Sequence, residues 1–109
     1  MRSRSGSIYN IYMHIISRKK LVEFWEQHAD AEGPLKAWYD HAKRAQWLTP
    51  ADVQNDYGDD AILPDNRAVF NIKGNRYRLV VRFNYTTQSI YIRFVGTHAE
   101  YNRIDATNI

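Results

Sequence analysis

Two kinds of hydrophobic spacing divide this chain. In the first half, apolar residues recur every three or four positions, as in Leu21, Phe24 and Trp25. In the second half they recur every second position, as in Phe70 and Ile72. A spacing near 3.6 residues predicts a helix and a spacing of two predicts a strand. The pattern therefore predicts a helical first half followed by a sheet.

Capping residues and breakers set the expected limits of the first elements. A short strand at 14–16 precedes the first helix, whose N-cap we expect at Ser17. A second helix is expected at roughly 35–47, and Thr49-Pro50-Ala51-Asp52 marks the start of a short third helix. Residues 57–66 are rich in Gly, Asp and Pro, so we predict a loop there.

Three strands follow in the second half. Alternation predicts them at 67–73, 76–83 and 89–95, joined by turns at 73–75 and 84–88. Such short connections favour an antiparallel meander. Three strands leave one face to cover, and the apolar sides of the helices can cover it. We therefore expect an α+β fold with a small twisted sheet packed on helices.

Length and composition favour one soluble domain. The chain has 109 residues, which suits a single domain, and we assign it to 12–109. Residues 1–11 are expected to be a flexible leader or a segment added ahead of the natural start. The absence of cysteine excludes disulfides, thiolate metal sites and a cysteine nucleophile. No run of apolar residues is long enough to span a bilayer, so we expect a cytoplasmic protein.

Positive charge is concentrated in the sheet half. Residues 1–60 carry 8 Lys+Arg and 9 Asp+Glu, whereas residues 61–109 carry 7 Lys+Arg and 3 Asp+Glu. The balance thus changes from −1 to +4, and six of the seven late cations are arginines. The planar guanidinium group suits phosphate better than an ammonium group does. The functional site is therefore expected in this half of the chain.

Alternation places these arginines on one face of the sheet, because successive strand residues point to opposite faces. On strand 76–83 we expect Tyr77, Leu79, Val81 and Phe83 to face the helices, and Arg76, Arg78, Val80 and Arg82 to face outward. On strand 89–95 we expect Ile90, Ile92 and Phe94 to face inward, and Tyr91, Arg93 and Val95 to face outward. Lys73 extends the cations at the adjoining turn. Like charges on neighbouring strands repel, so this face indicates an anionic partner such as nucleic acid.

One titratable pair follows the last strand. The imidazole of His98 can exchange a proton near neutral pH, and a helical turn places Tyr101 beside it. A capping histidine beside a core tyrosine is the structural alternative. The other histidines lack the spacing of metal ligands, and the chain has no phosphate-binding glycine loop. No metal and no cofactor are therefore expected.

Two blocks of sequence resemble the HigB-type toxins of the RelE/ParE superfamily. They are the segment 69–79, which reads Val-Phe-Asn-Ile-Lys-Gly-Asn-Arg-Tyr-Arg-Leu, and the segment 91–101, which contains Gly-Thr-His-Ala-Glu-Tyr. The resemblance implies a RelE-like fold and a type II toxin that acts as an mRNA endonuclease, commonly on ribosome-bound messages. It also implies neutralisation by an antitoxin, typically a helix-turn-helix protein encoded beside the toxin.

A mechanism without a metal follows as a hypothesis. Arg78 and Arg93 are expected to bind the reacting phosphate, with His98 as general acid or base and Tyr101 beside it. The further cations and one aromatic residue that we expect to bind the RNA are Lys73, Arg76, Arg82 and Tyr91. Two alternatives remain open: a non-catalytic inhibitor of DNA gyrase like the ParE relatives, and a plain RNA- or ribosome-binding module.

Overall fold

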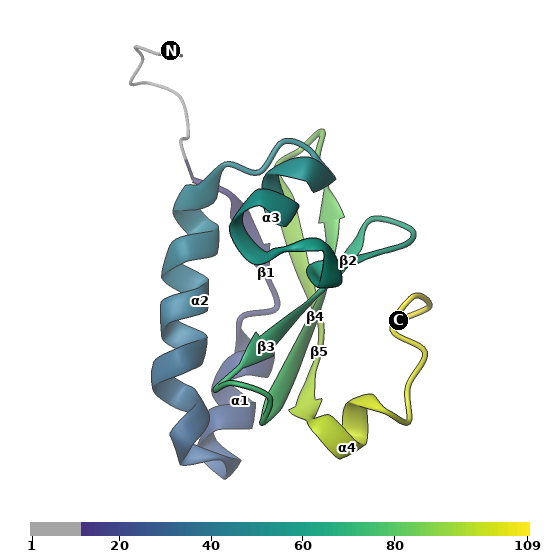
Figure 1. The fold of residues 1–109 in the computed structure, drawn as a ribbon. Coiled ribbons are helices and arrows are strands. Elements are labelled where there is room, and N and C mark those ends of the chain that lie inside the picture. The colour runs from purple at the N-terminus through teal and green to yellow at the C-terminus, as the bar shows by residue number, and fades with distance from the viewer. Residues whose placement is uncertain (1–11) are drawn as a thin grey trace.

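The computed structural model describes residues 12–109, so the leader predicted at 1–11 lies outside the described residues. The predicted α+β fold is confirmed (Figure 1). In chain order the elements are β1 (His14–Ile16), α1 (Lys19–Gln27), the 3₁₀ turn η2 (Ala29–Ala31), α2 (Glu32–Ala45), α3 (Pro50–Tyr57), the 3₁₀ turn η3 (Asp59–Ala61), β2 (Ile62–Leu63), β3 (Arg67–Ile72), β4 (Tyr77–Asn84), β5 (Ser89–Thr97) and α4 (His98–Tyr101).

The sheet is larger than the predicted meander. The three strands β3, β4 and β5 pair antiparallel as expected. The strand β1 adds to β5 in parallel, and β2 adds to β3, so the order is β1-β5-β4-β3-β2. The predicted loop at 57–66 was therefore wrong where it contains η3 and β2. A strand of two residues has no measurable hydrophobic period, which is why the pattern does not reveal it.

Local capping explains where the helices begin and end. Thr49 caps α3 as predicted, in a reciprocal capping box with Asp52. The predicted cap at Ser17 was wrong, because Ser17 has a left-handed φ of 73° and α1 starts after Arg18 with no side-chain cap. The helix α2 starts three residues earlier than expected, since Pro34 fits within its first turn. It ends where Gln46 adopts a left-handed conformation.

The helices cover one face of the sheet and enclose the core. Figure 1 shows α2 standing along that face, with α1 and α3 on the same side. The side chains of β4 predicted to face inward are all buried: Tyr77, Leu79, Val81 and Phe83. They pack with Leu21, Leu35, Trp38 and Trp47 from the helical half. This packing fixes which face of the sheet is left for function.

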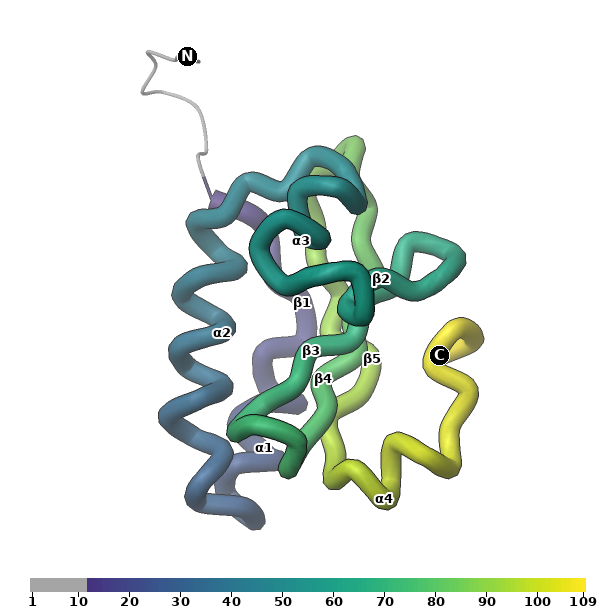
Figure 2. Tube along the Cα trace, viewed as in Figure 1, coloured from purple at the N-terminus to yellow at the C-terminus, as the bar shows by residue number. Residues whose placement is uncertain are grey.

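The segment after α4 lies on the opposite side of the sheet from α2 (Figures 1 and 2). Its end is held by Arg67, whose Nε and Nη2 donate to the carbonyl oxygen of Ile109 at 2.9 and 2.6 Å. On this outer face, Val80 is fully buried although its neighbours on β4 are arginines. The outer face is therefore partly covered at its β3 side.

A buried indole links the helical layer to α3. Trp47 is 1% exposed, and its Nε1 donates to Oδ2 of Asp56 at 2.9 Å. Nε2 of His41 lies 3.2 Å from the same oxygen. The hydrogen bond from Trp47 lowers the pKa of Asp56 below the ordinary value of 3.8.

Replacing Asp56 with alanine is expected to lower the free energy of unfolding by about 1 kcal/mol near pH 7, because the indole N–H loses its acceptor. The lowered pKa means that this contribution is complete above 3.8 and is lost as the pH falls through the folded value. Urea denaturation at neutral and acidic pH measures both effects. Asp56→Asn keeps an acceptor and serves as the control. Equal losses in the two variants would contradict this role of the bond.

Candidate functional site

The outer face carries cations from two adjacent strands. On β4 the outward residues are Arg78, Val80 and Arg82, and their partners on β3 are Asn71, Val69 and Arg67. Within residues 12–109 no carboxylate forms an ion pair with Arg78, Arg82 or Arg93. These three guanidinium groups therefore keep their charge available for an anion.

A bulge in β5 changes the predicted face of two residues. Val80 pairs with Phe94 and Val81 pairs with Ile92, so Arg93 is an extra residue between the two pairs. The prediction that Phe94 faces inward and Val95 outward was therefore wrong. Phe94 shares the outer face with Val80, whereas Val95 packs against the core. One extra residue reverses the alternation beyond it, and the sequence pattern alone does not mark its position.

One end of the outer face brings together Arg78, Tyr101 and the start of α4. The guanidinium carbon of Arg78 lies 5.8 Å from the ring centroid of Tyr101, within cation–π range. Nη1 of Arg78 also donates to the carbonyl oxygen of Asn75 at 3.2 Å. These contacts hold the guanidinium group over the start of β4, next to α4.

His98 is the exposed first residue of α4. Its backbone N–H donates to the carbonyl oxygen of Arg76 at 3.2 Å, which ties α4 to the start of β4. In the part of the chain that the structure describes, no hydrogen bond or ring contact joins the imidazole to Tyr101. The Tyr101 ring instead lies 6.4 Å from that of Phe94. The imidazole is therefore open to solvent and to a ligand.

A capping box that the sequence analysis missed fixes the start of α4. Oγ1 of Thr97 accepts from the backbone N–H of Glu100 at 3.1 Å, and Oε1 of Glu100 accepts from that of Thr97 at 2.8 Å. The bond from the Thr97 backbone lowers the pKa of Glu100, so this carboxylate stays charged near neutral pH. The signal was present as Thr-x-x-Glu at 97–100. This box positions His98.

Gly96 lets this arrangement form. A Cβ atom at Gly96 would lie 2.5 Å from Cζ of Phe94 and 2.9 Å from Oε1 of Glu100. An added methyl group must therefore move the Phe94 ring and the carboxylate of the capping box.

Replacing Gly96 with alanine is expected to lower the free energy of unfolding by about 1–3 kcal/mol, since the methyl group overpacks this corner. Thermal unfolding measures the loss. The matched control is Gly33→Ala in α2, where nothing lies within 4 Å of the new Cβ, so stability should be unchanged or slightly higher. If Gly96→Ala and Gly33→Ala had the same unfolding temperature, the corner at Gly96 would tolerate a side chain and the prediction would be wrong.

The other end of the outer face gathers Arg82, Tyr91 and Arg93. They line a cleft of about 550 Å³ beside the hairpin between β4 and β5. Arg82 pairs directly with Tyr91, whereas Arg78 pairs with Gly96, three residues beyond Arg93. Three strand residues span about 10 Å. The backbones of Arg78 and Arg93, which were expected at one phosphate, are therefore offset by about this distance along the face.

The turn between β3 and β4 holds the two remaining predicted residues. Lys73 and Gly74 both have left-handed φ values, 56° and 62°, so Lys73 is exposed at the tip of the turn. Nε of Arg76 lies 3.2 Å from Oδ2 of Asp30, in the turn between α1 and α2. The prediction that Arg76 belongs to the outward set was therefore wrong. This ion pair forms between residues far apart in the sequence.

Asp30 also accepts a hydrogen bond from the hydroxyl of Tyr77, and this bond lowers the pKa of Asp30. The carboxylate is thus a fixed negative charge at the helix side of the turn. Arg76 remains 65% exposed while paired with it. Arg76 can therefore still meet a ligand, but with part of its charge already balanced.

Between residues 12 and 109, no group of three or more His, Asp or Glu side chains is arranged to hold a metal ion. None of the described helices combines the length and the apolarity needed to cross a membrane.

Comparison with known proteins identifies the family. Residues 31–104 match the model of the HigB toxin family, described as the RelE-like toxic component of a toxin-antitoxin system. The chain belongs to the HigB toxin family. The resemblance inferred from segments 69–79 and 91–101 is thereby confirmed, and the fold agrees with a RelE-like one.

Similar proteins in the HigB family cover nearly the whole chain. The mRNA interferase toxin HigB of Escherichia coli (strain K12) is 29% identical over 98 residues, which are 88% of this chain and 94% of that protein. The mRNA interferase HigB of Escherichia coli O157:H7 and that of Shigella flexneri match with the same identity and coverage. The family match at residues 31–104 includes both ends of the outer face.

Proposed function

We propose that this HigB-family toxin is an endoribonuclease that cleaves mRNA, on the ribosome and without a metal ion. The observation that carries the proposal is the outer face, where Arg78, Arg82 and Arg93 have no carboxylate partner among the described residues. Uncompensated arginines on a sheet face suit a polyanionic chain. The similarity to proteins named mRNA interferase supports RNA as that chain.

The RNA backbone is proposed to follow the outer face from hairpin to α4. Arg82 and Arg93 bind phosphates in the cleft, and Tyr91, half-exposed beside Arg82, stacks on a base. Lys73 and Arg76 extend the positive surface at the turn between β3 and β4. Such contacts position the RNA without reading its sequence.

The chemistry is proposed to take place at the α4 end. The 2′-oxygen attacks the adjacent phosphorus, and the bond from phosphorus to the 5′-oxygen breaks. Arg78 stabilises the charge that develops on the phosphorane oxygens, and Tyr101 holds the guanidinium group in place. His98 transfers a proton, either from the 2′-hydroxyl or to the leaving 5′-oxygen. The products carry a 2′,3′-cyclic phosphate and a 5′-hydroxyl.

A cognate antitoxin is proposed to neutralise the activity. The family is the toxic component of a two-part system, so this chain has an antitoxin partner. We propose that the partner is of the helix-turn-helix type and is encoded beside the toxin. Covering the arginines of the outer face with acidic side chains is one way to block RNA access.

Mapping RNA ends after brief induction of the toxin tests the proposed function. Breaks inside translated frames, carrying the expected end groups, support it. Purified toxin should cut ribosome-bound message with undiminished rate in the presence of a chelator that leaves the ribosome's magnesium intact. Intact mRNA with damaged DNA would instead indicate a gyrase inhibitor. Tight, salt-dependent RNA binding without any cleavage would indicate a binding module.

A further inference from the structure

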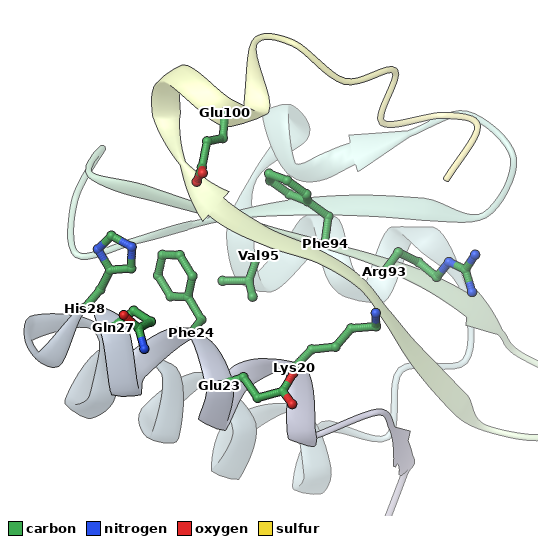
Figure 3. A pocket seen from close by; sticks show the side chains of 9 residues that line it. All are labelled: Lys20, Glu23, Phe24, Gln27, His28, Arg93, Phe94, Val95 and Glu100. Carbon is green, nitrogen blue, oxygen red and sulfur yellow. The ribbon is translucent and has the colours of Figure 1, made fainter.

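A groove lies between α1 and the far end of β5 (Figure 3). Its volume is about 410 Å³. The strand β1 pairs only with Ser89–Tyr91 of β5. Beyond Tyr91 this edge of β5 has no neighbouring strand among residues 12–109, and the groove lies there. One face of α1 contributes Lys20, Glu23, Phe24 and Gln27, and the residue after the helix contributes His28. The rest of the lining consists of Arg93, Phe94, Val95 and Glu100.

Aromatic and apolar side chains form part of the groove lining. Figure 3 shows Phe24 of α1 on the same side of β5 as Val95, with Phe94 on the other side of the β5 ribbon. Phe24 is held by stacking on His28 at 4.3 Å and by an edge contact with Tyr77 at 5.1 Å. A fixed aromatic ring is a platform on which any nucleobase can stack.

Polar groups without partners line the same groove. Among the described residues, the side chains of Lys20 and Gln27 form no hydrogen bond or ion pair. In Figure 3 the cations Lys20 and Arg93 lie toward one end, and Gln27 lies beside Phe24. An amide group next to a stacking platform can pair with the edge of a base, and the cations can hold its phosphate.

Arg93 connects the groove to the outer face. It lines both this groove and the cleft that contains Arg82 and Tyr91. A single strand held at Arg93 can therefore pass from one to the other. The lining holds two cations, Lys20 and Arg93, and two carboxylates, Glu23 and Glu100, so the continuity through Arg93 is what favours RNA over a peptide as the occupant.

We infer that the groove binds one unpaired base of the mRNA and selects its identity through Gln27, with Phe24 as the stacking surface. The inference rests on the proposed function, since it names how the same enzyme chooses its cleavage position. It assigns a binding role to α1, a helix outside the arginine-bearing sheet.

Two variants test the groove. Gln27→Ala removes the amide, and Phe24→Leu removes the aromatic ring while keeping an apolar side chain. Glu26→Ala is the matched control, since Glu26 is the exposed neighbour of Gln27 on α1 and does not line the groove. Full-length wild-type and variant toxins are added to ribosomes with a defined message, and the RNA ends are mapped. The preference for one base beside the cut should fall about 10-fold in the two groove variants and stay unchanged in the control.

A binding assay separates failure of this inference from failure of the proposed function. Fluorescence anisotropy measures the affinity of each toxin for short homopolymeric oligoribonucleotides, and circular dichroism confirms that each variant is folded. If wild-type toxin prefers one oligomer and loses that preference in the groove variants, the inference holds even where no RNA is cut. If the preferences and cleavage positions of wild type and groove variants are the same, the inference is wrong. Impaired neutralisation by antitoxin with unchanged base preference would show a protein-docking groove and also overturn it.

Discussion

Replacing His98 with alanine is expected to slow mRNA cleavage by about 10²- to 10⁴-fold, because the proposed reaction loses its general acid or base. The side chain is exposed at the first position of α4, so its removal leaves no cavity. The capping box that starts α4 is formed by Thr97 and Glu100 and does not involve the imidazole. The variant should therefore fold normally and keep its affinity for RNA.

Single-turnover cleavage of ribosome-bound message measures the effect of the His98 change. His14→Ala is the control, since His14 is an exposed histidine on β1, outside the outer face of β4 and α4. A second readout is the pH dependence of the rate, which should lose one ionisation in the His98 variant but not in the control. If His98→Ala cuts message as fast as wild type, another group transfers the proton and the proposed mechanism is wrong.

Replacing Arg78 with alanine is expected to lower the single-turnover rate by about 10²- to 10³-fold, the cost of removing one group that stabilises transition-state charge. Arg78 is held by Tyr101 and by the carbonyl oxygen of Asn75, so its guanidinium group is positioned before substrate binds. Arg78→Lys keeps the charge but loses the planar group, and we expect it to recover only part of the rate.

Arg82→Ala is the contrasting variant on the same strand. Arg82 lies in the cleft at the hairpin end, where the proposed role is to bind the RNA backbone. Its loss should weaken RNA binding and reduce the slope of log affinity against log salt concentration by about 1, with little change in the rate of bound substrate. If Arg78→Ala and Arg82→Ala alter rate and binding in the same proportions, the two ends of the face do not have separate roles.

The separation of the two ends has a consequence for how the site works. Arg78 and Arg93 are offset by about three strand residues along the face, roughly 10 Å between backbones. We propose that Arg78 acts at the reacting phosphate and that the other arginines bind neighbouring phosphates. Binding energy from the hairpin end can then hold the RNA in position for attack at the α4 end.

Much of the fold was determined by signals that act over a few residues. The change of spacing from 3.6 to 2 separated helices from strands, and Thr49 with Asp52 marked the start of α3. The three strands of the meander and the buried set on β4 followed from alternation. These predictions succeeded because each depends only on the residues within one element or one turn.

The positions of the site residues depended instead on contacts between distant parts of the chain. The bulge at Arg93 places Phe94 on the outer face and Val95 on the core side. The ion pair with Asp30 turns the side chain of Arg76 toward the turn between α1 and α2. The pairing of β1 with the first residues of β5 left the rest of that edge to α1, which created the groove.

By itself, the sequence determined that this protein has an α+β domain with arginines concentrated on its sheet. Only the tertiary structure decided which of them meet Tyr101 and which meet Tyr91. The physical reason is that the spacing of residues along one strand determines which face of the sheet each side chain points to. Strand register, bulges and ion pairs depend instead on the free energy of packing the whole domain.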